Sequence, residues 1–120
     1  MTRGLTVTLF AAHVAYGAVL LAVPHKITRS WLGPAVEGDP VKVALRSVAG
    51  REITLHGLGI AAALSGRPLK PWLAASLAGD LNDLAATVAG RAGLPEGSAI
   101  KTAAAAGGSA ALTAAVLAVA

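Results

Sequence analysis

The stretch from residue 46 to residue 56, RSVAGREITLH, decides how this chain can fold. It places Arg51, Glu52 and His56 inside a run that otherwise resembles a membrane-spanning helix. Charged side chains inside such a helix are costly, so they are usually retained for a function and paired with other polar groups. The other segments must therefore supply polar partners to these three side chains.

The composition of the chain favours lipid as its surroundings. Of the 120 residues, 55% are hydrophobic and 13% are charged, whereas an ordinary soluble domain is about 25% charged. The mean hydropathy is +0.67. Many of the apolar residues are small, which suits helices that pack closely inside a bilayer. We expect a single domain, residues 1–120, in contact with a lipid bilayer.

Two classes of chemistry are excluded by composition. The chain has no cysteine, which removes disulfides, thiol redox reactions and cysteine–metal sites. The net charge is +4, but most of the ten Lys and Arg residues lie near the ends of the apolar segments. Basic residues at helix ends are typical of membrane anchors. No nucleic-acid partner is therefore expected.

Four apolar segments are long enough to cross a hydrocarbon core of about 30 Å. The first has no charge between residues 4 and 24, which is longer than the core of a secretion signal, so we expect it to remain as a span. Asp39 and Pro40 form a helix start. We predict an all-α, integral membrane four-helix bundle with spans at about residues 5–23, 40–65, 71–91 and 98–119.

Polar side chains recur near the middle of each predicted helix. Short connections make neighbouring helices antiparallel, so the helix midpoints should lie at one depth. The side chains at this depth are His13 and Tyr16, then Arg51, Glu52 and His56, then Asp80 and Asp83, then Ser109 and Thr113. This alignment predicts one polar site that all four helices share.

The predicted site holds more acids than cations. Glu52, Asp80 and Asp83 face Arg51, with Arg46 partly available. Two nearby carboxylates in a low dielectric do not both ionise easily, so one acid could stay protonated and donate a proton. Its ionised partner, or His56, could accept a proton, and Arg51 could hold a developing oxyanion.

This pattern predicts two sets of site residues. The expected catalytic residues are Asp80, Asp83, Glu52, Arg51 and His56, with the two aspartates as the acid–base pair. The expected substrate-binding residues are His13, Tyr16, Arg46, Trp72, Ser76 and Asn82. No metal and no cofactor are expected, because the sequence has no metal-binding spacing, phosphate loop or serine-nucleophile elbow.

A structural interpretation of the same residues stays open. Arg51 with Asp80 or Asp83 could form an internal ion pair that only fixes the register of the helices. Glu52 and His56 are four residues apart and could form a private hydrogen bond. His13 could be a packing residue with its polar atoms satisfied.

The stretch from about residue 42 to residue 92 resembles a family. Arg46, Arg51–Glu52, Leu58–Gly59 and the Asp80–Asp83 helix look like those of small four-helix bacterial membrane proteins of the DoxX-like and related uncharacterised families. The resemblance implies the four-span architecture and says almost nothing about activity, since such families include accessory subunits. At the level of chemistry alone, an Arg with two Asp, a Tyr and an Asn is similar to the site of limonene-type epoxide hydrolases, which have another fold. Integral-membrane terpenoid cyclases also resemble this site, because they open epoxides with buried carboxylic acids.

The leading hypothesis is an enzyme of the cell membrane, multi-pass, that acts by acid–base chemistry on a lipophilic small molecule. Epoxide opening, cyclisation or isomerisation fits best, because each needs proton transfer and a dry pocket but no cofactor. The alternative is a small proton-coupled transporter, which would work as a homo-oligomer, or an accessory subunit of a membrane complex.

Overall fold

The computed structural model describes residues 1–120, and all of its secondary structure is helical. Its elements are α1 (Thr2–Ala22), α2 (Pro24–Leu32), the 3-10 helix η1 (Gly33–Glu37), α3 (Asp39–Leu64), α4 (Lys70–Ala89), the 3-10 helix η2 (Arg91–Gly93) and α5 (Ser98–Val119). The four long helices begin and end within three residues of the expected segments. Proline and glycine separate them, which is why the boundaries can be seen in the sequence.

The prediction of an integral membrane four-helix bundle is wrong. The structure has five α-helices, and only α1 and α5 are long and apolar enough to cross a membrane. α3 and α4 carry charged side chains at their centres, which lowers their hydropathy. The fifth helix, α2, forms between the first two of the four expected spans.

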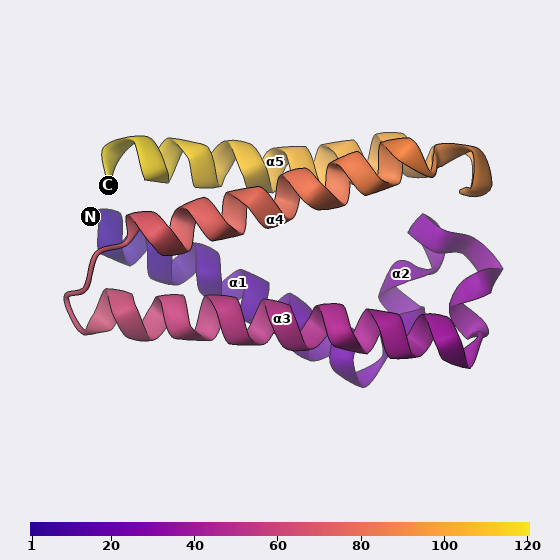
Figure 1. Ribbon diagram of the computed structural model, residues 1–120, viewed down its shortest axis with the longest axis horizontal. Helices are drawn as coiled ribbons and strands as arrows, with labels where there is room; N and C mark the ends of the chain where they lie inside the picture. Colours follow the sequence, from indigo (N-terminus) through magenta and orange to yellow (C-terminus); the bar gives the residue numbers. More distant parts are fainter.

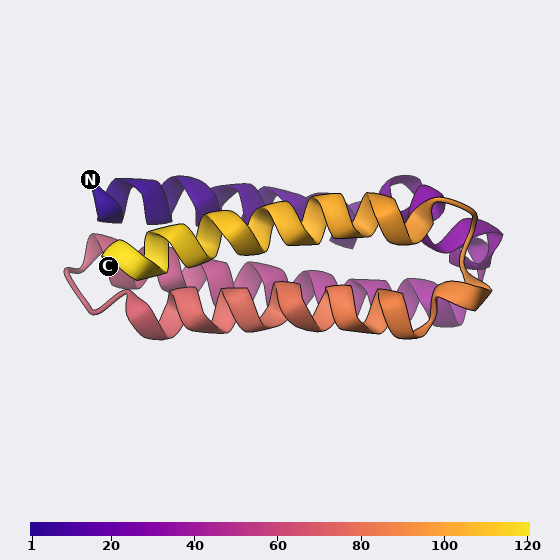
Figure 2. The same ribbon diagram turned by 90° about the horizontal axis from the view of Figure 1, so that it is seen from above.

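The long helices run side by side along a molecule that measures 43 × 25 × 16 Å. Figures 1 and 2 show α1 beside α3 and α4 beside α5, with both chain termini at one end and α2 at the other. α3 and α4 are joined by a short loop and separate as they run away from it (Figure 1). This divergence leaves room between two helices that are consecutive in the chain.

Two glycines let α1 approach α3 closely. A Cβ atom on Gly17 would lie 2.9 Å from Cγ1 of Ile53 and 3.1 Å from the carbonyl oxygen of Ala49. A Cβ atom on Gly59 would overlap the ring of Phe10, which therefore packs directly on the α3 backbone. These two contacts fix the separation of α1 and α3.

The apolar core is divided into two clusters. One lies near the termini and contains Phe10, Ala63, Leu69 and Leu73. The other lies toward α2 and contains Leu20, Val36, Leu45 and Ala49. The stretches of α1 and α3 between the two clusters carry polar side chains, and the candidate site lies there.

Candidate functional site

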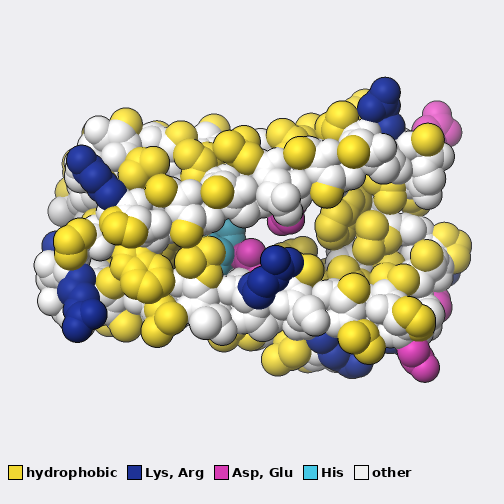
Figure 3. Space-filling model, viewed as in Figure 1, with side chains coloured by type: hydrophobic (Ala, Val, Ile, Leu, Met, Phe, Trp, Pro, Cys, Tyr) yellow, Lys and Arg dark blue, Asp and Glu magenta, His cyan; other side chains and the backbone are white.

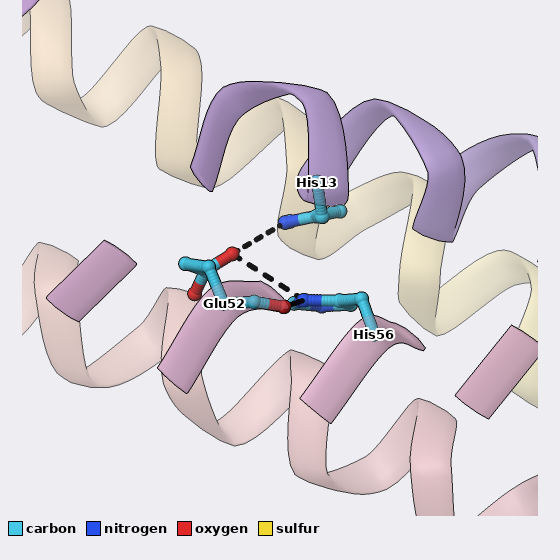
Figure 4. A group of neighbouring side chains, drawn as sticks. All are labelled: His13, Glu52 and His56. Carbon is cyan, nitrogen blue, oxygen red and sulfur yellow. Dashed lines mark hydrogen bonds and ion pairs between the residues drawn. The ribbon is translucent and has the colours of Figure 1, made fainter. Parts of the chain in front are cut away.

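A cluster of two histidines and one glutamate joins α1 to α3. Figure 4 shows His13 of α1 directed toward Glu52 and His56 of α3, and we call these three residues the His–Glu cluster. Oε2 of Glu52 lies 3.0 Å from Nδ1 of His13 and 3.4 Å from Nδ1 of His56. The two imidazole rings stack with their centroids 4.1 Å apart. Helical spacing places Glu52 beside His56, and Gly17, one turn beyond His13, allows α1 to come close enough.

Hydroxyl groups extend this cluster to the other two long helices. Nε2 of His56 lies 2.9 Å from Oγ of Ser76 on α4. Nε2 of His13 lies 3.1 Å from Oγ of Ser109 on α5, and Ser109 donates a hydrogen bond of 2.7 Å to Oδ2 of Asp80 on α4. One hydrogen-bonded network therefore connects all four long helices, at the level where the sequence aligned their polar residues.

The contacts of His56 fit its neutral form. Its Nδ1 lies 2.8 Å from the carbonyl oxygen of Glu52, which can only accept, so Nδ1–H donates. Nε2 then accepts from the hydroxyl of Ser76. Burial, followed by the neighbouring His13, lowers the pKa of His56, while Glu52 and Asp80 oppose this shift. His56 is buried, and in its neutral form both ring nitrogens have hydrogen-bond partners.

His13 contacts the carboxylate of Glu52 directly and that of Asp80 through the Ser109 hydroxyl. Nδ1–H donates to Glu52, and Ser109 uses its own hydrogen for Asp80, so Nε2–H of His13 donates to the Ser109 oxygen. In this arrangement both ring nitrogens of His13 donate hydrogen bonds, so His13 is an imidazolium held between Glu52 and Ser109.

An open cleft of about 750 Å³ lies where α3 and α4 diverge. Its polar wall includes Arg51, Glu52, Asn82 and Asp83. Its apolar wall is formed by Val48, Leu55, Leu58 and Trp72. Figure 3 shows the hollow between the two helices, with histidine and acidic atoms in its floor and a basic side chain at its mouth. The cleft is amphipathic and meets the buried network at Glu52.

Asp83 in this cleft holds its proton more readily than an ordinary aspartate. Partial burial raises its pKa above the ordinary carboxyl value, and the negative charges of Glu52 and Asp80 raise it further. Arg51 and a hydrogen bond from Asn82 offset only part of this effect. A carboxylic acid with a raised pKa beside a cleft is suited to proton donation.

The structure distributes the expected site residues over three places. The buried network contains His13, Glu52, His56, Ser76 and Asp80. The cleft wall contains Arg51, Glu52, Trp72, Asn82 and Asp83. The remaining two residues do not line the cleft: Arg46 donates to the carbonyl oxygen of Leu21 at 3.2 Å, and Tyr16 is 45% exposed.

Two details of the site differ from the simplest reading of the sequence. Arg51 forms no ion pair with an aspartate of α4 and lies exposed at the cleft, so it does not fix the register of the helices. Ser109 connects His13 to Asp80; the sequence placed it at the level of the polar site but not among the catalytic or substrate-binding residues. Its position at mid-helix in an alanine-rich segment was the only signal for it.

Comparisons with known protein families, curated proteins and solved structures found no match to this chain. The resemblance of residues 42–92 to DoxX-like proteins therefore stays a prediction.

Proposed function

We propose that this protein is an enzyme that binds a small, largely apolar molecule in the cleft between α3 and α4 and acts on it by acid–base chemistry. The observation that carries this proposal is the double position of Glu52, which belongs both to the buried network and to the cleft wall. The two imidazoles of His13 and His56 position the Glu52 carboxylate, and this carboxylate can contact a molecule bound in the cleft.

Asp83 is the proton donor in this proposal. It lines the cleft together with Asn82 and retains its proton more readily than an ordinary aspartate. Protonation of a substrate oxygen by a positioned carboxylic acid is ordinary general acid catalysis. The resulting Asp83 carboxylate can then remove a proton from an adjacent carbon, so that an isomerisation leaves the enzyme in its starting state.

Glu52 and Arg51 supply fixed charge on the two sides of the reacting group. Oε2 of Glu52 faces the two histidines, while its Oε1 has no hydrogen-bond partner. Oε1 is therefore free to stabilise positive charge that develops on a substrate carbon as an oxygen is protonated. Arg51 is exposed at the cleft and can stabilise an oxygen that becomes negative. Epoxide opening, cyclisation and isomerisation need these elements.

The test is turnover of lipophilic epoxides by purified protein in mild detergent. Styrene oxide and limonene oxide are suitable probes, with Glu96→Gln as a control because Glu96 is an exposed loop acid. Asp83→Asn should abolish turnover and Glu96→Gln should not. Equal turnover in wild type and Asp83→Asn would overturn the role of Asp83. A transporter or an accessory subunit would turn over neither probe.

We also propose that the protein is bound to the cell membrane through α1 and α5. Both helices are long and apolar enough to cross a membrane, and most of their side chains lie outside the bundle core. Leu112 of α5, for example, is 62% exposed. In this proposal both helices cross the bilayer, so the protein is multi-pass. Because the chain has no cysteine, single cysteines at Gly4 and Ser30 can be labelled from either side of sealed vesicles. Labelling from opposite sides is expected for a segment that crosses the bilayer.

A further inference from the structure

We infer that the His–Glu cluster is a binding site for one divalent transition-metal ion, with His13, Glu52 and His56 as its protein ligands. This goes beyond the proposed acid–base function, because metal binding requires neither a substrate nor Asp83. The sequence predicted no metal site, since His13 lies far from the other two ligands along the chain and no known ligand spacing occurs.

The three donor atoms lie close enough to converge on one metal ion after small rotations of the side chains. Nδ1 of His13 and Nδ1 of His56 lie 3.0 and 3.4 Å from Oε2 of Glu52, and all three atoms lie within 4.8 Å of one another. Metal–ligand bonds of about 2.1 Å place neighbouring ligands roughly 3.0 to 3.4 Å apart in octahedral or tetrahedral geometry. Two histidines and one carboxylate form a ligand set that zinc and iron sites use.

The hydrogen-bond partners of the two remote ring nitrogens, Nε2 of His13 and Nε2 of His56, also fit a metal site. A ligating histidine usually has its remote ring nitrogen hydrogen-bonded, which fixes the ring and its tautomer. Nε2 of His13 is held by Ser109, which is itself bonded to Asp80, and Nε2 of His56 is held by Ser76. Both rings are thus oriented with Nδ1 toward Glu52. A purely structural Glu52–His56 contact within one helix would not require a second histidine from α1.

Without a metal, N–H groups take the place of the cation. Nδ1–H of His13 points at the Glu52 carboxylate, and Nδ1–H of His56 points at the Glu52 carbonyl oxygen. Metal binding requires His13 to release its Nδ1 proton to solvent and His56 to carry its proton on Nε2, where the Ser76 oxygen can accept it. The two stacked rings must also turn, so that each Nδ1 lone pair points at the ion and that of His56 leaves the Glu52 carbonyl oxygen. The Glu52 carbonyl still accepts the helical N–H four residues later, so no backbone group is left unsatisfied.

An ion in this place would be accessible from the cleft. Glu52 lines the cleft, and three protein ligands leave coordination positions free for water or another small ligand. A metal with open positions is the arrangement of catalytic rather than purely structural sites. The inference therefore assigns the cleft a Lewis acid in addition to the carboxylic acid of Asp83.

The test is titration of chelator-treated protein, without a histidine tag, with Co²⁺ followed by visible absorption and with Zn²⁺ followed by calorimetry. One equivalent should bind. His13→Gln and Glu52→Ala should weaken binding by roughly 100-fold or more, and Ser109→Ala by about 10-fold. His25→Ala should bind as wild type does, since His25 is the one histidine outside the cluster.

Three outcomes separate this inference from the alternatives. Failure of wild-type protein to bind Co²⁺ and Zn²⁺ would overturn it, and so would wild-type affinity in both His13→Gln and Glu52→Ala. Helix content by circular dichroism shows whether a variant has folded, and Ser109→Ala provides a milder change if the others have not. Asp83→Asn should bind metal normally while it loses turnover, so the metal site and the acid–base function can fail independently.

Discussion

Nδ1 of His13 lies 3.0 Å from Oε2 of Glu52, although the two residues are 39 positions apart in the chain. This contact joins α1 to α3 between the two apolar clusters. It also holds Glu52 at the boundary between the buried network and the cleft. The proposed chemistry and the proposed metal site both depend on this pair.

Removing the His13–Glu52 pair should lower the free energy of unfolding more than removing an exposed ion pair does. His13→Ala leaves a partly buried carboxylate and Ser109 without their partner, which should lower the free energy of unfolding by about 1–3 kcal/mol. The matched control is Glu37→Ala, which removes the exposed Arg29–Glu37 pair at 2.6 Å. That change should cost less than about 1 kcal/mol. Urea unfolding in mild detergent measures both, and equal costs would show that the His13–Glu52 pair contributes no more than a surface pair.

Gly17 should be intolerant of even a methyl group. In Gly17→Ala the new Cβ would lie 2.9 Å from Ile53 and 3.1 Å from a backbone oxygen, so α1 and α3 must move apart. We expect a loss of about 1–3 kcal/mol in the free energy of unfolding. Gly57→Ala is the control, because nothing lies within 4 Å of its new Cβ, and it should gain up to about 1 kcal/mol from helix propensity. A neutral Gly17→Ala would contradict the close contact of the two helices.

The raised pKa of Asp83 predicts how stability depends on pH. Because the pKa of Asp83 in the folded protein lies above the ordinary value of 3.8, the folded state holds more protons than the unfolded state between the two values. The contribution of Asp83 to the free energy of unfolding therefore falls as pH rises through this window.

Asp83→Asn removes this titration, so the variant should gain stability relative to wild type as pH rises from 3.5 to 7. The gain should stay below about 1 kcal/mol, because water still reaches the carboxylate and screens it. Urea unfolding at several pH values measures the difference, with Glu96→Gln as the control. A relative loss of stability at pH 7 would mean that the ionised Asp83 carboxylate is stabilised rather than penalised.

Trp72 should report binding in the cleft. The chain has two tryptophans, and only Trp72 lines the cleft. Trp31 donates a hydrogen bond to the hydroxyl of Thr87 and does not line the cleft. In Trp31→Phe the fluorescence comes from Trp72 alone, and addition of limonene oxide should change its intensity or wavelength. In Trp72→Phe the remaining Trp31 signal should not respond. An equal response of both variants would indicate partition into detergent instead of binding in the cleft.

The sequence contains enough information for the long helices and for the level of the site. Proline and glycine mark the helix ends, and the apolar runs between them have helical length. The alignment of His13, Glu52 and Asp80 at one level depends only on helix order and on short connections, which is why the network could be anticipated. Helical spacing alone placed Glu52 beside His56.

The cleft and the ligand geometry could not be predicted in the same way. α3 and α4 diverge because α3 packs closely on α1, at Gly17 and Gly59, while α4 packs on α5. Such preferences between surfaces leave no periodic signal in the sequence. The direction in which His13 points depends on Ser109, which looks like any small polar residue in an alanine-rich helix. The mean hydropathy of the whole chain also concealed a difference among the helices. α1 and α5 are apolar enough to cross a membrane, whereas α3 and α4, which carry charged side chains at their centres, are not.

The central claim is that a small apolar molecule occupies the cleft between α3 and α4. Gly79 lines this cleft, and an added Cβ there meets nothing within 4 Å, so Gly79→Leu should fill the cleft without disturbing the fold. Gly4→Leu is the matched control, at an unobstructed glycine in the first turn of α1. The most direct measurement is mass spectrometry of lipophilic molecules that co-purify with each protein in mild detergent.

A discrete molecule should be bound to wild type, Asp83→Asn and Gly4→Leu, and it should be absent from Gly79→Leu. The same molecule bound at the same level to Gly79→Leu, or no discrete molecule in any of the four proteins, would contradict the claim.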